Sequence, residues 1–482
     1  MKNKRITLTV LISILVCSGL LIGCSAGKAA KEETSGTITT MEKEEVPEFN
    51  FGLDGDVMPI YGYYGPIASY INRDGNTLPD YITDEYFKMI ADVGINLITH
   101  SDVDYIGYSD LVNKSLDLCE KYGIGYMVKD SKILEYANRE DITAAEVGER
   151  LGEYADHPAF SGVFLVDEPR SQYWQPGDGS KLIPKYENIM KIMQEELEVV
   201  GYHSPFPIWD MDKAKNKENY EKYIAEYFEY LHPQFITIAH YPFYPEQYPD
   251  TDDIAEYFYN VSLIRDYTNK DNVPFIGTVQ AGSQWNDEKQ IFDSVTPYYP
   301  SEGQFNWNAH TLLAMGSRGI GYFPILQPEH FAWAESAEWD SQRNGLIGAL
   351  GNKTMWYNFA QNVNKQVAAI DEVLMNAAHK GIVVNGERTE KETKYIECKI
   401  KSGQFQQLQS LTGEAIVGCF NYQGKTALYV VNNDMEYAQK VTLHLNEACN
   451  MRLIQNAESS YVNAKNLTLD MAAGEGVLVV IE

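Results

Sequence analysis

The sequence lacks the cysteine patterns that hold small secreted domains together or bind zinc. Six cysteines are spread over 482 residues, and no two of them stand in a CxxC spacing. This excludes a zinc ribbon and a dense disulfide framework. Cys119, Cys398, Cys419 and Cys449 are expected to be mostly buried small apolar residues, and one disulfide among the last three stays open.

Several catalytic signatures are also missing. No glycine-rich phosphate loop follows the first apolar run, which disfavours nucleotide binding. No strand-to-helix elbow of the GxSxG type supports Ser/His/Asp hydrolysis. His100, Asp102 and His240 lack the HxxxH-type spacing of a metal site, so we expect satisfied buried histidines and predict neither a metal nor a cofactor.

Positive charge is scarce. The chain has 39 Lys and Arg against 68 Asp and Glu, which gives a formal net charge of −29. Such an acidic surface repels polyanions, so nucleic acid is excluded as a partner. The composition suits an exported protein that acts on neutral substrates.

The first residues form an export signal. Three basic residues among the first five precede an apolar run over residues 6–22. Residues 21–24 (LIGC) then resemble the lipobox of bacterial lipoproteins, which implies that Cys24 is lipidated and anchors the chain outside the cell. A plain secretory signal or a short membrane anchor is the alternative.

A polar segment follows this signal. Residues 25–48 are mostly Lys, Glu, Thr, Ser, Gly and Ala, with almost no apolar spacing. We expect residues 1–24 to be a signal peptide and residues 25–48 a flexible tether. No later stretch is apolar enough to span a membrane.

From residue 58 the chain repeats one unit, an apolar run followed by a polar loop and an amphipathic helix. The eight expected strands cover residues 58–63, 95–100, 124–128, 163–166, 206–209, 235–239, 273–279 and 319–323. This alternation predicts a (β/α)8 TIM barrel over residues 49–378, with a doubly wound open sheet as the alternative.

The pattern of apolar and polar residues changes after the last helix of this repeat. From about residue 381 the apolar runs are short and alternate with polar residues, as in residues 415–420 and 476–481. This alternation predicts a small antiparallel β-sandwich over residues 379–482.

The fourth strand ends in two acids and a proline, Asp167, Glu168 and Pro169. Two carboxylates are costly at the end of a buried strand unless they face a cleft or are paired. In a parallel α/β protein, ligands bind at the carboxyl ends of the strands. Asp167 and Glu168 are therefore the first candidates for a catalytic site. The alternative is that the two acids only end the strand and are solvated there.

Other strand ends carry acids, amides and aromatic residues. The predicted substrate-binding residues are Asp102, Asp130, Trp174, His240, Tyr241, Gln280, Trp285 and Trp307. Aromatic rings stack on the C–H faces of sugars, while acids and amides bond hydroxyl groups. The set suits a neutral carbohydrate, although about half of these aromatics are expected only to fill loop cores.

Four segments carry a family resemblance. They are residues 162–169 (GVFLVDEP), 240–243 (HYPF), 312–323 (LLAMGSRGIGYF) and 473–478 (AGEGVL). With them, residues 50–482 resemble glycoside hydrolase clan A, most nearly the family-42-like β-galactosidases and related glycosidases of gut bacteria.

The resemblance implies roles for individual residues. Glu168 matches the acid/base of that clan, and Asp167 stands where the clan usually has Asn. The clan's nucleophile, a Glu at the end of the seventh strand, is replaced by Gln280. An amide cannot attack a sugar, which leaves three interpretations. Asp210, Glu329 or Asp130 acts as the second carboxylate, the seventh strand has another register, or catalysis is lost.

The sequence therefore predicts a surface-anchored glycoside hydrolase that cleaves neutral oligo- or polysaccharides. Glu168 would protonate the leaving oxygen, because neighbouring Asp167 and the apolar strand end favour its protonated form. Asp210 or Glu329 would activate water or attack the sugar. A non-catalytic glycan-binding lipoprotein is the alternative, either a degenerate barrel or a two-lobed solute-binding protein.

Overall fold

The computed structural model describes residues 41–482 with internal gaps. The gaps are residues 54, 56, 69–79, 99–102, 177–178, 180–181, 209, 212, 214, 244–250, 283–284, 287–290, 293–299, 327–344, 349–350 and 402, and only the backbone is described for 251–252, 285–286 and 291–292. The predicted signal peptide and most of the predicted tether lie outside the described residues.

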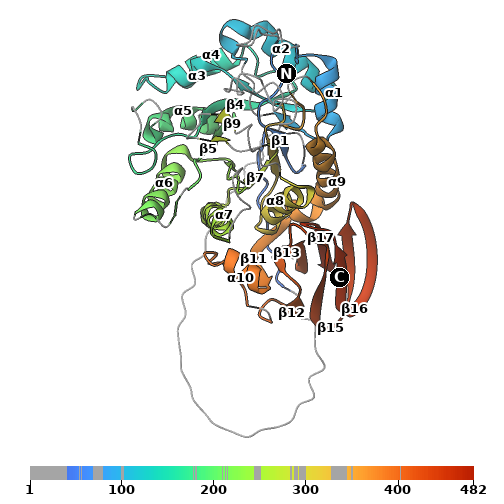
Figure 1. Cartoon of the computed structure of the whole chain (residues 1–482). Helices are drawn as coiled ribbons and strands as arrows, with labels where there is room; N and C mark the ends of the chain where they lie inside the picture. Colours follow the sequence, from blue (N-terminus) through green and yellow to red (C-terminus); the bar gives the residue numbers. More distant parts are fainter. Residues whose placement is uncertain are drawn as a thin grey trace. The chain divides into compact units, whose positions relative to one another are not determined.

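Eight parallel strands form the first sheet (Figure 1). They are β1 (Ile60–Gly62), β2 (Leu97–Ile98), β3 (Gly125–Lys129), β4 (Phe160–Asp167), β5 (Gly201–Ser204), β6 (Ile236–Ile238), β7 (Phe275–Gln280) and β10 (Ile320–Phe323). They pair in the order β5-β4-β3-β2-β1-β10-β7-β6. A hydrogen bond of 3.2 Å between the hydroxyls of Tyr202 and Thr237 joins β5 to β6. The predicted (β/α)8 barrel is confirmed, and the open-sheet alternative is set aside.

Helices connect these strands around the outside of the barrel (Figure 1). They are α1 (Asp84–Asp92), α2 (Tyr105–Tyr122), α3 (Ser131–Tyr136), α4 (Ala144–Leu151), α5 (Glu187–Lys191), α6 (Asn216–Leu231), α7 (Thr251–Asp271), α8 (Glu302–Ala314) and α9 (Met355–Met375). Capping boxes begin α4 at Thr143 and α8 at Ser301. Their side chains accept hydrogen bonds from backbone N–H groups that the first turn leaves without helical partners.

The prediction for the fifth strand was wrong in position. We expected it at residues 206–209, but β5 runs from Gly201 to Ser204. Pro205 and Pro207 lack the backbone N–H that a central strand must donate, so the chain leaves the sheet before them. The strand itself contains Tyr202 and His203, both buried.

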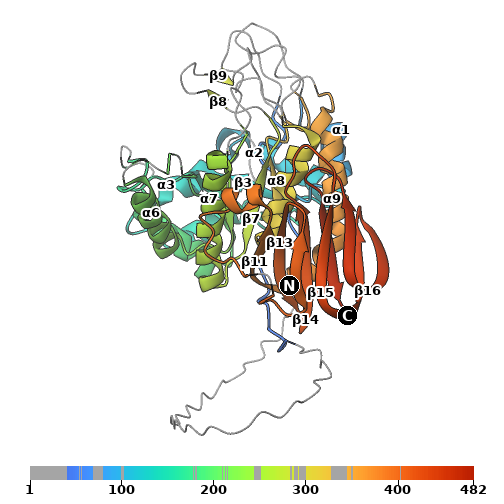
Figure 2. The same ribbon diagram turned by 60° about the horizontal axis from the view of Figure 1, so that its bottom comes forward.

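Seven antiparallel strands form the C-terminal domain (Figure 2). They are β11 (Ala377–Asn385), β12 (Leu408–Thr412), β13 (Ala415–Tyr422), β14 (Lys425–Asn432), β15 (Gln439–Gln455), β16 (Glu458–Met471) and β17 (Gly476–Ile481); the short α10 (Glu387–Glu392) lies among them, and the small hairpin β8 (Trp285–Asn286) and β9 (Ile291–Phe292) belongs to the barrel segment.

The long strand β15 turns this sheet into two layers. Its first half pairs with β12 and its second half with β17, and a β-bulge lies between His444 and Cys449. Side chains such as Val417 and Val479 from one part share a core with Leu443 from the other. The predicted antiparallel β-sandwich is therefore confirmed.

Helix α8 packs directly on the sandwich. Trp307 Nε1 donates a hydrogen bond of 2.6 Å to Asn433 Oδ1, and His310 Nδ1 lies 2.8 Å from the Tyr429 hydroxyl. All four residues are buried. The barrel and the sandwich thus share a buried polar contact.

The four described cysteines are free, and three of them are buried. This confirms the prediction of mostly buried small apolar residues, and the disulfide left open among Cys398, Cys419 and Cys449 is not formed. In the part of the chain that the structure covers, no helix has the length and apolar character needed to cross a membrane.

The end of the predicted tether contacts the folded domains. Lys380 Nζ lies 2.8 Å from Glu44 Oε1, and Asn421 Nδ2 donates 2.7 Å to the carbonyl of Glu42. Glu42 and Glu44, at the end of the predicted 25–48 tether, therefore contact β13 and β11 of the sandwich.

Buried His310, in the contact between α8 and the sandwich, makes the stability of the folded protein pH-dependent. Burial lowers the pKa of His310 to about 4. The unfolded chain binds the proton below about pH 6.5 and the folded chain does not, so stability falls as the pH drops from 6.5 towards 4. We expect His310→Gln to reduce the loss of unfolding free energy between pH 7.5 and 5.5 by about 1 kcal/mol, measured by urea unfolding. Equal losses in both proteins would contradict this.

Candidate functional site

A sharp turn at the end of β4 places two acids side by side. Asp167 is the last residue of β4, and Glu168 has a positive φ of 48°. The Glu168 N–H donates 2.8 Å to the carbonyl of Ser204, and the Tyr223 hydroxyl donates 3.0 Å to the carbonyl of Pro169. Glu168 therefore leaves the strand conformation directly after Asp167. Both acids are half-buried.

Tyr63 holds the first of these acids. It follows β1, is only 8% exposed, and donates its phenol hydrogen to Asp167 Oδ2. Its ring is fixed edge-on against Phe164 and Phe323, with centroids 6.2 and 5.7 Å away. A buried phenol therefore fixes the orientation of the Asp167 carboxylate.

Further tyrosines surround the two acids. The ring of Tyr241 stacks on Phe323 at 5.3 Å. Burial, then the neighbouring Tyr61, Glu168 and Asp167, raise the pKa of Tyr241 well above its usual value. The Tyr241 phenol therefore stays neutral.

Tyr202 and Tyr223 belong to the same group. Burial is the main cause of the raised pKa of each, and the charge of Asp167 adds to it; Glu168 contributes at Tyr223. These phenols stay neutral, so they offer hydroxyl donors and acceptors beside aromatic faces. We call Asp167, Glu168 and the four tyrosines 63, 202, 223 and 241 the β4 acid site.

Gln280 lies at the end of β7, where its amide braces two loops. Its Nε2 donates to the carbonyls of Phe243 and Gly282 at 2.8 and 3.0 Å, and its Oε1 accepts from the Phe243 N–H at 3.1 Å. The side chain is buried, at 3% exposure. Only an amide can donate two bonds and accept one here, which gives Gln280 a structural role.

We expect Gln280→Glu to lower the free energy of unfolding by about 1–3 kcal/mol. A carboxylate would face the carbonyls of Phe243 and Gly282 without a hydrogen to donate. Chemical unfolding at neutral pH measures the loss. An unchanged stability combined with new or higher hydrolysis would instead assign this position to catalysis.

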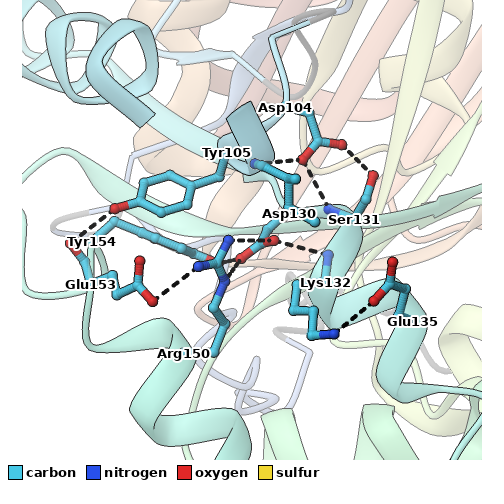
Figure 3. A network of polar contacts seen from close by, with 10 residues as sticks. Asp104, Tyr105, Asp130, Ser131, Lys132, Glu135, Arg150, Glu153 and Tyr154 are labelled. Carbon is cyan, nitrogen blue, oxygen red and sulfur yellow. Dashed lines mark hydrogen bonds and ion pairs between the residues drawn. The ribbon is translucent and has the colours of Figure 1, made fainter. Parts of the chain in front are cut away.

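Asp130 lies in a network of polar contacts with Arg150, Tyr154 and Lys132 (Figure 3). Its two oxygens accept from Arg150 Nε at 2.7 Å and Nη2 at 3.0 Å, from the Tyr154 hydroxyl at 3.0 Å, and from the Lys132 N–H at 3.0 Å. These four bonds fill the carboxylate, which is 1% exposed. Asp130 therefore anchors α4 to the end of β3, which corrects its predicted roles as substrate ligand or second carboxylate.

Trp307 lies outside the β4 acid site. Its ring is 0% exposed, packs against Tyr257 and Phe258, and donates to Asn433. With both ring faces covered, it leaves no surface for a sugar. This corrects the prediction that Trp307 belongs to the sugar platform.

Trp174 and His240 are buried near strand ends. Trp174 meets Tyr220 edge-on, with the ring centroids 5.2 Å apart. His240 meets Tyr257 in the same way at 5.7 Å, and burial lowers its pKa to about 3, so its imidazole is neutral. Their roles as substrate ligands stay predictions.

Asp210 is exposed on the loop after β5. Its carboxylate pairs with Lys213, and its carbonyl accepts 3.1 Å from Asn216 Nδ2. Glu256 on α7 lies nearby and accepts a hydrogen bond from the Met211 N–H. Burial raises the pKa of Glu256 to about 7; the Met211 bond opposes this rise, and the charges of Asp210 and Asp253 add to it. The contacts of Asp210 lead to α6 and α7, and its role as the second carboxylate stays a prediction.

The remaining predicted residues fall outside the described part. They are Cys24, His100, Asp102, Glu329 and the side chain of Trp285. Their roles stay predictions.

One described cluster, Asp117, Glu120 and His157, has the composition of a metal site. His157 Nε2 lies 3.3 Å from Asp117 Oδ1 and 3.8 Å from Glu120 Oε2. However, His157 Nδ1 accepts 3.2 Å from the Ala159 N–H, so Nε2 carries the hydrogen and lacks the lone pair that a metal needs. The cluster fits a hydrogen bond from the His157 Nε2–H to the neighbouring acids.

Comparisons with known proteins give similarity in solved structures alone. No protein-family model and no curated protein matches the sequence. A glycoside hydrolase is 14% identical, with a TM-score of 0.48, over 92% of this chain and 97% of that one. The trehalose-6-phosphate hydrolase of Bacillus licheniformis (10%, 0.48) and the β-galactosidase of Bacillus circulans sp. alkalophilus (10%, 0.45) each cover 88% of this chain and 99% of their own.

Proposed function

We propose that the chain is a glycoside hydrolase with Glu168 as its proton donor. The observation that carries this proposal is the β4 acid site itself, in which two adjacent half-buried carboxylates lie at the carboxyl end of a barrel strand among neutral tyrosines. Carboxyl groups supply the acid and base of most glycosidases, and aromatic faces with hydroxyls suit neutral sugars.

Glu168 would protonate the leaving oxygen. Its negative neighbour Asp167 disfavours a second charge, which keeps a proton available at Glu168. Tyr63 would hold Asp167 in one orientation through the cited hydrogen bond. Asp210 and Glu329 remain our candidates for activating water or attacking the sugar.

A non-catalytic glycan-binding protein is the second candidate. One observation favours this candidate. The amide of Gln280 is hydrogen-bonded to the backbone of Phe243 and Gly282 at the strand end where clan A has its nucleophile. A barrel without that carboxylate would keep the sugar-binding aromatics and lose the chemistry.

We further propose an extracytoplasmic location. The LIGC segment at residues 21–24 supports lipidation of Cys24, with the segment up to residue 40 as the link from the membrane to the folded domains. Metabolic labelling with a radioactive fatty acid would test this. Wild-type protein should be labelled and Cys24→Ala should not.

The test of the enzymatic proposal is product release by the full mature chain. Plant, host and microbial glycans and a series of aryl glycosides are incubated with the protein, and reducing ends or free phenol are measured. Release supports a hydrolase. No release, with retardation of the protein by one glycan in affinity electrophoresis, would instead support the binding protein.

A further inference from the structure

The β4 acid site has both of its acids on one strand end. In the described residues, the ends of β6, β7 and β10 (236–243, 275–282 and 320–326) hold no Asp or Glu. A retaining glycosidase of the usual kind needs its two carboxyl groups about 5–5.5 Å apart on opposite sides of the bond that breaks. Neighbouring residues of one turn are poorly suited to flank a sugar in this way.

Two adjacent acids suit a different division of labour. Some glycosidases use a group of the substrate as the nucleophile, so that the protein supplies one proton donor and one stabilising charge. Asp167 and Glu168 can divide these two roles, because Asp167 accepts a hydrogen bond from the Tyr63 phenol and Glu168 directly follows it in the chain. A bonded donor favours the ionised form of an acid, so Asp167 is the fixed negative charge of the pair.

We propose that the substrate is a 2-acetamido sugar whose own amide oxygen is the nucleophile, with Glu168 as proton donor and Asp167 as the carboxylate that binds the amide N–H. This inference rests on the proposed function and adds the substrate class to it. It gives the role of nucleophile to the substrate and that of base to Glu168, in place of Asp210 and Glu329. It also gives a reason for Gln280, because such a reaction needs no carboxylate at the end of β7.

The first step balances within the substrate and Glu168. The acetamido carbonyl oxygen forms a bond to the anomeric carbon while the glycosidic C–O bond breaks, and Glu168 gives its proton to the departing oxygen. The product is a cyclic oxazolinium ion, whose positive charge and N–H face the Asp167 carboxylate. An amide in place of Asp167 could accept the hydrogen but would supply no charge.

The second step consumes one water molecule. The Glu168 carboxylate takes a proton from water, the water oxygen forms a bond to the anomeric carbon, and the bond to the amide oxygen breaks. The acetamide is restored, and the configuration of the sugar is retained after two displacements. Tyr63 is a positioning residue, since it acts through Asp167.

The test compares aryl glycosides that differ only at C2. The 4-nitrophenyl glycosides of N-acetylglucosamine and N-acetylgalactosamine, as α and β anomers, are each paired with the matching glucoside or galactoside. We expect one 2-acetamido compound to be cleaved at least about 10²-fold faster than its 2-hydroxy partner, the scale of a correctly placed catalytic group. Replacing its acetyl group by trifluoroacetyl should lower kcat strongly, because the carbonyl oxygen becomes a weaker nucleophile.

Variants assign the roles. Asp167→Asn should lower kcat on the 2-acetamido compound by about 10²-fold with a much smaller change in KM, the scale of one lost electrostatic contact in a transition state. Tyr63→Phe should move the acidic limb of the kcat/KM profile to higher pH, because Asp167 loses its donor; a merely structural role would leave that limb in place. The trifluoroacetyl series uses the wild-type protein and stands even if a variant misfolds.

The outcomes separate this inference from the proposed function. Equal or faster cleavage of a 2-hydroxy glycoside, or a rate that does not respond to trifluoroacetyl, would overturn the substrate-assisted inference and leave the hydrolase proposal intact. No cleavage of any glycoside would overturn both.

Discussion

Glu168→Gln is expected to lower kcat on a glycan or an ordinary aryl glycoside by about 10²–10⁴-fold, the usual contribution of a general acid. Glutamine keeps the size of the side chain and the backbone turn at φ 48°, but it has no proton to give to the leaving oxygen. Binding should persist, since the tyrosines of the β4 acid site are unchanged. Initial rates and KM, measured at fixed pH on the same substrate, provide the check.

A change of leaving group makes this test specific. A 2,4-dinitrophenyl group departs without protonation, so Glu168→Gln should lose far less kcat/KM, which reports the bond-breaking step, on that glycoside than on a 4-methylphenyl one. Glu149→Gln on the exposed face of α4 is the matched control and should retain full activity. Equal losses on both leaving groups would show that Glu168 is not the proton donor.

The sequence contains the periodicity that builds the barrel. Apolar runs and helix caps alternate over residues 58–323, and each predicted strand except the fifth coincides with an observed one. Gly201–Ser204 was missed because it is short and contains a histidine, whereas the more apolar stretch after it is interrupted by two prolines. Hydrophobicity located the segment, and the need for backbone donors moved the strand.

The candidate site could be predicted only in part. The acids at residues 167 and 168 stand out because an apolar strand ends in charge. The same rule failed at Asp130, since a strand end does not reveal whether its side chain points into the barrel or toward the next helix. Arg150, the partner that settles this, lies twenty residues further along the chain.

Aromatic residues show the same limit. Trp307 lies on a helix that is buried all round, so its sequence neighbourhood does not distinguish a ligand platform from a domain contact. Tyr63 directly follows the first strand and could have been chosen by the rule that selected Asp167. Tyr202 could not, because the fifth strand was placed after it.

Asp130→Ala is expected to lower the free energy of unfolding by about 3–5 kcal/mol, the usual cost of removing one partner of a buried ion pair. Arg150 Nε and Nη2 would lose their bonds of 2.7 and 3.0 Å, and the Tyr154 hydroxyl would lose its acceptor. The Arg150 side chain is only 16% exposed, so water compensates poorly. Urea unfolding at neutral pH measures the change.

Glu153→Ala is the matched control, because Glu153 contacts the same guanidinium at 2.9 Å from a side chain that is 50% exposed. An ion pair in solvent contributes about 0–1 kcal/mol, so this variant should remain close to wild type. If Asp130 anchors α4 as the structure indicates, the folded fraction of Asp130→Ala should keep its KM. A wild-type stability together with a KM raised tenfold or more would instead restore Asp130 as a substrate ligand, because a carboxylate that binds sugar affects the complex and not the folding equilibrium.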